Sequence, residues 1–118
     1  MDRGFSTRYR EEEREMNKYC AFAGIGLIPW GPLNSGQLAR PLASSTTTRG
    51  ETWKDRHKWG ATEGEDEIVR RLEKVAGDKG WTMSQVALAW IGEKVTSPIV
   101  GFSSVSRRVP QLGMRLFT

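Results

Sequence analysis

The sequence predicts an α/β protein with parallel strands. Two short segments, 24–28 and 97–104, carry aliphatic residues and each runs into glycine and small polar residues. Helical patterns lie between them, and strands that are separated by helices pair in parallel. The chain has 118 residues with 37% hydrophobic and 27% charged content, which suits one soluble domain. Because two short strands alone make a marginal sheet, the sequence resembles a slice of a larger one.

The first helix is expected over residues 10–23. Apolar residues recur at intervals of three and four and predict a buried stripe on one face. The glutamates at 11–13 fall in the first turns, where they favour the positive end of the helix dipole. Gly24 is placed to end the helix in a left-handed C-cap. We interpret Cys20 as a core residue rather than a nucleophile. The stripe consists of Met16, Tyr19, Cys20 and Ala23.

The segment 24–41 reads GIGLIPWGPLNSGQLARP, an apolar strand that stops at a rigid turn. Pro29 and Pro32 have no N–H to donate to a sheet, so they end the ladder. Residues 42–64 are rich in serine, threonine and glycine and read as a long surface loop, of a kind that is often functional. His57 lies in this loop between two cations, with no acid, nucleophile or metal partner in sequence, and is expected to be exposed.

Two further helices are expected, over 65–76 and 82–94. Thr62 with Glu65 and Thr82 with Gln85 have the spacing of a capping box. Gly77 and Gly80 are expected to mark the end of the earlier helix. The predicted buried positions are Ile68, Leu72, Val75 and Ala76 in one helix, and Met83, Val86, Ala87, Trp90 and Ile91 in the other.

Charge and composition disfavour several classes of function. The net charge is +4, but acidic runs at 11–13 and 65–67 interrupt the cations, so no basic stripe for nucleic acid is expected. No apolar run approaches the ~18 residues of a membrane span, and the N-terminus has no signal-peptide core. The single cysteine, Cys20, allows no internal disulfide and gives no metal spacing. These features predict a cytoplasmic protein without metal.

Five segments, in order along the chain, carry a resemblance to a known family. They are YREEEREM, GIGLIPWGPL, TTRGET, QVALAW and TSPIVGFSSV. Together they resemble the aldo-keto reductase superfamily, in its aryl-alcohol dehydrogenase-like branch. The resemblance covers 9–107, and it implies the last quarter of a (β/α)8 TIM barrel, strands seven and eight with flanking helices. By this comparison 1–8 is a divergent N-terminus and 108–118 a divergent tail.

The resemblance implies a site for NADP(H), because the family uses this cofactor to reduce aldehydes and ketones. Loops after strands seven and eight of such barrels hold phosphate at the C-terminal face. Ser103 and Ser104 would donate hydroxyl hydrogen bonds to the adenosine 2′-phosphate, and Arg107 would clamp it as a cation. The implied cofactor-binding residues are Gly31, Pro32, Leu33, Asn34, Ser35, Gly36, Gln37, Leu38 and Arg40 in one loop, and Gly101, Phe102, Ser103, Ser104 and Arg107 in the other.

Departures from the family pattern predict weak or vestigial cofactor binding. The family usually has serine where this chain has Gly31, and commonly Ala-Arg where it has Asn34-Ser35. A lost neutral hydrogen bond is worth about 1 kcal/mol. The family's catalytic tyrosine, lysine, aspartate and histidine lie in the first half of the barrel, and no motif here matches theirs. No catalytic residue is therefore assigned.

Two hypotheses follow. In the first, the chain is a truncated aldo-keto reductase-like protein that keeps the cofactor's phosphate half-site, and a missing barrel half is its possible partner. In the second, it is a small non-catalytic interaction module whose contact surface is the loop at 42–64.

Overall fold

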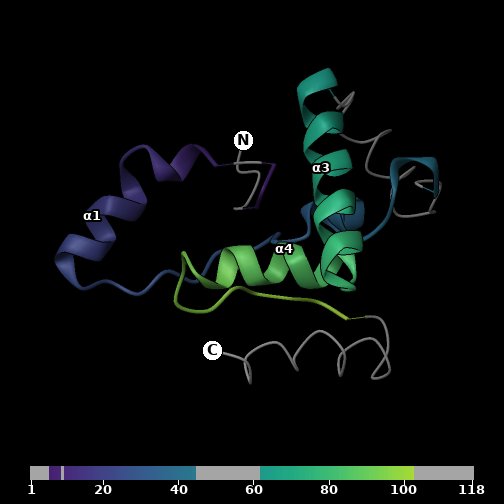
Figure 1. The fold of residues 1–118 in the computed structure, drawn as a ribbon. Coiled ribbons are helices and arrows are strands. Elements are labelled where there is room, and N and C mark those ends of the chain that lie inside the picture. Colours follow the sequence, from purple (N-terminus) through teal and green to yellow (C-terminus); the bar gives the residue numbers. More distant parts are fainter. Residues whose placement is uncertain (1–5, 9, 45–61, 103–118) are drawn as a thin grey trace.

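Two helices packed against each other carry the fold of the computed structural model, which describes residues 6–8, 10–44 and 62–102 (Figure 1). Helix α3 (Glu63–Lys79) is the longer, and α4 (Met83–Gly92) follows it after a short turn. Helix α1 (Met16–Ala23) lies apart from both. Three short 3-10 helices complete the described elements: η1 (Glu11–Glu13), η2 (Asn34–Ala39) and η3 (Leu42–Ser44). Both η2 and η3 contact α3, and η2 also contacts α4.

Both predicted capping boxes are confirmed. The Thr62 hydroxyl accepts from the Glu65 N–H at 3.3 Å, and the Glu65 carboxylate accepts from the Thr62 N–H at 2.8 Å. Thr82 and Gln85 repeat this exchange at the start of α4, at 3.2 and 2.8 Å. Each box satisfies N–H groups that the first turn of a helix leaves without partners. The N-terminal ends of α3 and α4 therefore follow from four residues that are visible in the sequence.

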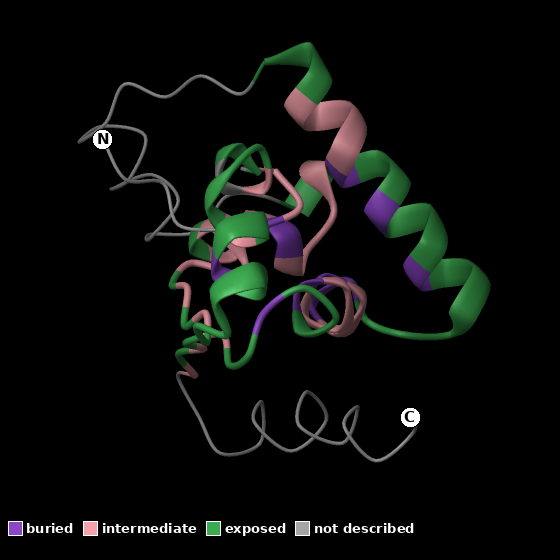
Figure 2. Cartoon of the chain, turned by 90° about the vertical axis from the view of Figure 1, so that its left-hand side faces the viewer, coloured by how far each residue is buried: buried purple, intermediate pink, exposed green. Residues whose placement is uncertain are grey.

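The main hydrophobic core lies between α3, α4 and the loop that contains η2 (Figure 2). Val69 rather than Ile68 points into it from α3, Val75 is exposed, and Gly77 lies inside the helix, which ends at Gly80. The buried residues of this core are Leu38, Val69, Leu72, Ala76, Met83 and Ala87. A smaller cluster joins Ile91 and Val95 at the other end of α4, with Leu27, Leu88 and Trp90 against it.

Helix α1 is shorter and more exposed than the sequence predicts. Its C-cap is Gly24 in the left-handed conformation, as expected, but the glutamates at 11–13 form η1 instead of its first turn. Of the predicted stripe only Cys20 is buried, and Phe22 on the same helix is 92% exposed. An apolar stripe is buried only where another element covers it. Among the described residues, η1 is the one element packed closely on α1.

The two predicted strands are reduced to one isolated parallel bridge, between Trp30 and Ile99. The described residues contain no longer strand, so the assignment of strands seven and eight is not confirmed. Pro29 supplies a physical reason. The Ser97 N–H donates to the Leu27 carbonyl at 3.1 Å, and a parallel ladder would return a hydrogen bond from the N–H of residue 29. Proline has no N–H, so the ladder is broken there.

No helix of the described segments is both long enough and apolar enough to span a membrane. The predicted loop at 42–64 contains η3 at its start and the first turn of α3 at its end. His57 and the rest of that loop, 45–61, lie outside the described residues.

Candidate functional site

The Trp30–Ile99 bridge pairs the two segments that lead into the predicted phosphate-binding loops. The Ile99 N–H donates to the Pro29 carbonyl at 2.9 Å, and both segments run in the same direction. The chain therefore continues from the bridge into Gly31 on one side and toward Gly101 on the other. A Cβ built on Gly101 would meet nothing within 4 Å, so its backbone borders open space.

The loop at 31–40 is built around a left-handed turn. Gly31 has φ 70°, and then three successive residues, Asn34, Ser35 and Gly36, have φ 47°, 57° and 89°. Glycine adopts these angles without penalty and asparagine tolerates them, whereas Ser35 is strained there. Two backbone hydrogen bonds close the turn, from Asn34 N–H to Gly31 O at 2.9 Å and from Gly36 N–H to Leu33 O at 3.0 Å.

Two apolar residues anchor this loop in the fold. Leu38 is fully buried in the main core, and Pro32 is also buried. The Leu38 N–H is taken by the Leu33 carbonyl at 3.2 Å. Leu38, which the sequence placed among the cofactor contacts, therefore serves to hold the loop on α3 and α4. The turn between the two anchors stays at the surface: Ser35 is exposed, and a Cβ on Gly36 would meet nothing within 4 Å.

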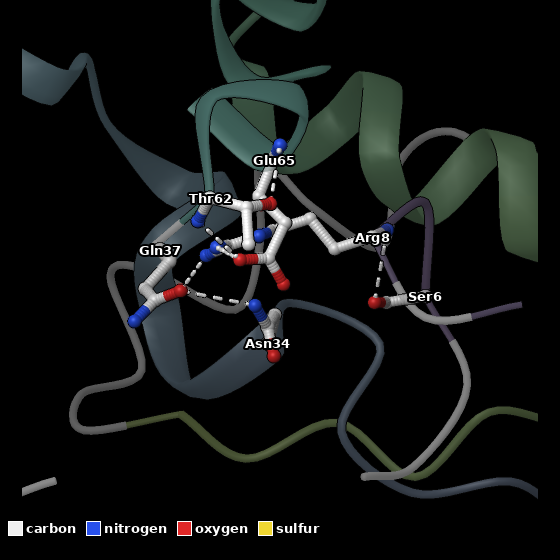
Figure 3. Close-up of polar contacts among 6 residues, drawn as sticks. All are labelled: Ser6, Arg8, Asn34, Gln37, Thr62 and Glu65. Atoms are coloured by element: carbon white, nitrogen blue, oxygen red, sulfur yellow. Dashed lines mark hydrogen bonds and ion pairs between the residues drawn. The ribbon is translucent and has the colours of Figure 1, made fainter. Parts of the chain in front are cut away.

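A polar network ties the same loop to the start of α3 (Figure 3). The Arg8 guanidinium donates through Nη1 to the Gln37 side-chain oxygen and pairs through Nη2 with the Glu65 carboxylate at 3.0 Å. Gln37 accepts a second hydrogen bond from the Asn34 amide at 3.0 Å. The Arg8 side chain is only 6% exposed. One buried cation thus joins the N-terminal segment, the loop and the helix cap.

The charge of Glu65 is stabilised within this network. Burial alone would raise the pKa of its carboxyl group. The hydrogen bond from the Thr62 N–H, together with the charge and hydrogen bond of Arg8, outweighs burial and lowers the pKa below its usual range. Glu65 therefore remains a carboxylate that neutralises Arg8 while it caps α3. Its negative charge near the loop is thereby compensated.

The structure accounts for the predicted site residues unevenly. The loop at 31–40 is described in full, and Gly101 and Phe102 follow the bridge, exposed and half-buried respectively. Ser103, Ser104 and Arg107 lie outside the described residues. Arg8 was missed by sequence reasoning because it falls in the segment that departs from the family pattern. Glu65 was identified as a cap but not as a partner of Arg8.

The described residues offer no metal-binding cluster, and two glycine positions border open space. No group of three histidine, cysteine, aspartate or glutamate side chains in 6–8, 10–44 and 62–102 could hold a metal. The open space beside Gly36 and Gly101 instead leaves backbone at two loop positions accessible to a ligand.

Comparisons with known proteins bear on this reading. A family model for the aldo/keto reductases matches residues 5–114. The aldo-keto reductase dtxS3 of Metarhizium robertsii is 43% identical over 98% of this chain and 32% of its own length. The versiconal hemiacetal acetate reductase of Aspergillus parasiticus is 42% identical over 83% of this chain and 30% of its own length. A putative aryl-alcohol dehydrogenase of Saccharomyces cerevisiae, AAD16, is 38% identical over 87% of this chain and 31% of its own length. The chain thus spans about a third of the length of these curated relatives.

Proposed function

The chain belongs to the aldo/keto reductase family, and from that premise we propose that it supplies the part of the fold that binds the phosphates of NADP(H). The observation that supports the proposal is the Trp30–Ile99 bridge, because it pairs the two segments that lead into Gly31 and Gly101. In parallel α/β barrels, ligands bind where the strands end, at the C-terminal face. The loop at 31–40 and the segment that begins at Gly101 would be in that position in the whole barrel.

The loop at 31–40 is proposed to wrap the pyrophosphate and its ribose. The turn at Asn34, Ser35 and Gly36 is exposed or half-buried, while Leu38 fixes its far end in the core. The open space beside Gly36 lets a ligand approach the turn, and the buried anchor limits the freedom that binding would have to remove.

The second loop is proposed to hold the adenosine 2′-phosphate. Ser103 and Ser104 would donate hydroxyl hydrogen bonds, and Arg107 would pair with two phosphate oxygens through its planar guanidinium. Charge-assisted, bidentate pairs of this type are stronger than hydrogen bonds between neutral groups. This loop would distinguish NADP(H) from NAD(H).

The reaction of the whole family member is proposed to be NADPH-dependent reduction of an aldehyde or ketone to an alcohol. NADPH supplies the hydride when it is bound. The residues of this chain orient the cofactor through its phosphates, and the remainder of the barrel is proposed as the partner that supplies the proton donor. The names of two relatives, an aryl-alcohol dehydrogenase and a versiconal hemiacetal acetate reductase, refer to alcohol and hemiacetal substrates of those proteins.

A calorimetric titration of NADP⁺ against NAD⁺ tests the proposal. The chain should prefer NADP⁺, and Arg107→Ala should remove the preference at a cost of roughly 1.5–3 kcal/mol, as for a hydrogen bond to a charged group. Arg108→Ala is the matched control, because it removes the neighbouring cation and should leave the preference intact. Equal affinity for both nucleotides, or no binding at millimolar concentration, would refute the site.

A further inference from the structure

Arg8 is a buried cation between two elements that sequence reasoning did not connect (Figure 3). Its side chain is 94% buried, and its two terminal nitrogens contact different elements, Gln37 in the loop and Glu65 in α3. Within the described residues its Nε has no hydrogen-bond partner, and neither does the hydroxyl of adjacent Thr7. Burial of an incompletely satisfied guanidinium is unfavourable unless its remaining contacts are strong.

The contacts of Arg8 act on the conformation of the loop. Gln37 receives hydrogen bonds from both Arg8 and Asn34, and Asn34 is the first residue of the left-handed turn. Glu65 cannot move away from Arg8 without breaking the cap on α3, since the same carboxylate accepts the Thr62 N–H. A rigid helix end is thereby connected, through one guanidinium, to the turn that borders the open space at Gly36.

We propose that Arg8 is a positioning residue for the pyrophosphate part of the cofactor site: it fixes the turn at 34–36 through Gln37, against the capped end of α3. The inference rests on the proposed function and adds to it a residue outside both phosphate-binding loops. Lysine cannot replace Arg8 fully, because an ammonium is a point charge, whereas the planar guanidinium reaches Gln37 and Glu65 together.

The test separates the two halves of the cofactor by titration with NADP⁺ and with adenosine 2′-monophosphate. The second ligand has the 2′-phosphate but no pyrophosphate. Arg8→Met should weaken the affinity for NADP⁺ about tenfold and leave the affinity for adenosine 2′-monophosphate unchanged. The NADP⁺ affinity of Arg8→Lys should lie between those of Arg8→Met and the unsubstituted chain. Gln37→Met should also weaken NADP⁺, and the double variant should lose less than the sum of the two single losses, because each single variant already removes the Arg8–Gln37 hydrogen bond.

Arg70→Met is the matched control. Arg70 is an exposed arginine of α3 that pairs with Glu67, and its removal should change neither affinity. Equal weakening of both ligands by Arg8→Met would show a general loss of structure and overturn the positioning role, and so would unchanged NADP⁺ affinity. Should Arg8→Met fail to fold, Gln37→Met removes the same contact from the loop and decides by the same criteria.

Hydrogen exchange tests the coupling of Arg8 to the loop separately from nucleotide binding. Amides of 34–40 should exchange faster in Arg8→Met, while those of α4 stay as protected as in the unsubstituted chain. Absence of NADP⁺ binding by the unsubstituted chain would refute the cofactor function, and with it the role of Arg8 toward the cofactor. Unchanged exchange at 34–40 would refute the coupling of Arg8 to the loop, whatever the nucleotide result.

Discussion

Leu27 and Thr96 are joined by two hydrogen bonds: the Leu27 backbone donates in one and accepts in the other. The Leu27 N–H donates to the Thr96 hydroxyl at 2.9 Å, and the Leu27 carbonyl accepts from the Thr96 N–H at 3.1 Å. This pair lies just before the Trp30–Ile99 bridge along both segments. A Cβ at Gly26 would come within 3.2 Å of the same hydroxyl, so the fit is close. The pair therefore helps to set the register in which the two segments before the candidate loops are paired.

Thr96→Val tests this register. Valine keeps the shape of threonine but removes the hydroxyl that accepts the Leu27 N–H. The free energy of unfolding should fall by about 1 kcal/mol, the usual worth of a neutral hydrogen bond. Urea unfolding measures the change. Thr96→Ser, which keeps the hydroxyl, should stay closer to the unsubstituted chain; an equal loss in both variants would point to packing instead.

Acid stability should depend on Glu65. Its pKa is lowered in the folded protein, so the unfolded chain binds more protons as the pH falls. The stabilisation is present above the ordinary glutamate pKa of about 4.3 and is lost as the pH falls through the lowered pKa. Glu65→Gln keeps a residue that can complete a capping box and removes the charge. Unfolding measured between pH 6 and pH 3 should therefore show a shallower loss in the variant. Parallel pH profiles would contradict this role.

Local signals predicted the helices well, and long-range packing was predicted less well. The capping boxes at Thr62 and Thr82 are short-range chemistry and fixed the start of α3 and α4. The apolar face of α1 predicted a buried stripe of which only Cys20 is buried, because burial depends on neighbours that periodicity cannot show. The sequence placed the end of a strand at Pro29. In the structure Pro29 also interrupts the pairing of the preceding residues, because it has no N–H to complete the exchange that Ser97 begins with Leu27.

The sequence indicated the turn in the loop at 31–40, but it did not reveal the residues that hold this loop in place. The prolines at 29 and 32 indicated a rigid turn after the apolar segment, and the structure gives four residues of 31–36 positive φ. Leu38 was placed with the ligand contacts because it lies in the same motif, but its side chain belongs to the core. Arg8 could not be found by motif, since its partners Gln37 and Glu65 are distant in sequence and meet only in the fold.

The 118 residues are expected to show no NADPH-dependent carbonyl reduction by themselves. They contain no motif matching the family's catalytic tyrosine, lysine, aspartate and histidine, so no group is assigned to donate the proton that general acid catalysis requires. The measurement is NADPH absorbance with a panel of aromatic aldehydes. A heat-inactivated sample is the control, and steady NADPH consumption above that control would contradict the prediction.

One glycine-to-alanine change, made at two positions, should shift stability in opposite directions. Gly36 has φ 89° in the candidate loop, whereas Gly77 lies inside α3 without a positive φ. A Cβ at either position would meet nothing within 4 Å, so crowding is absent and backbone conformation alone decides the sign.

Gly36→Ala should lower the free energy of unfolding by about 1–2 kcal/mol, because an L side chain is disfavoured in the left-handed region. Gly77→Ala should raise it by about 0.5–1 kcal/mol, since alanine favours the helix interior and restricts the unfolded chain. Urea unfolding of the two variants side by side gives the signs. If Gly36→Ala were neutral, the turn at 34–36 would not need its left-handed form, and the candidate loop would lose the feature that brings its backbone to the open space at Gly36.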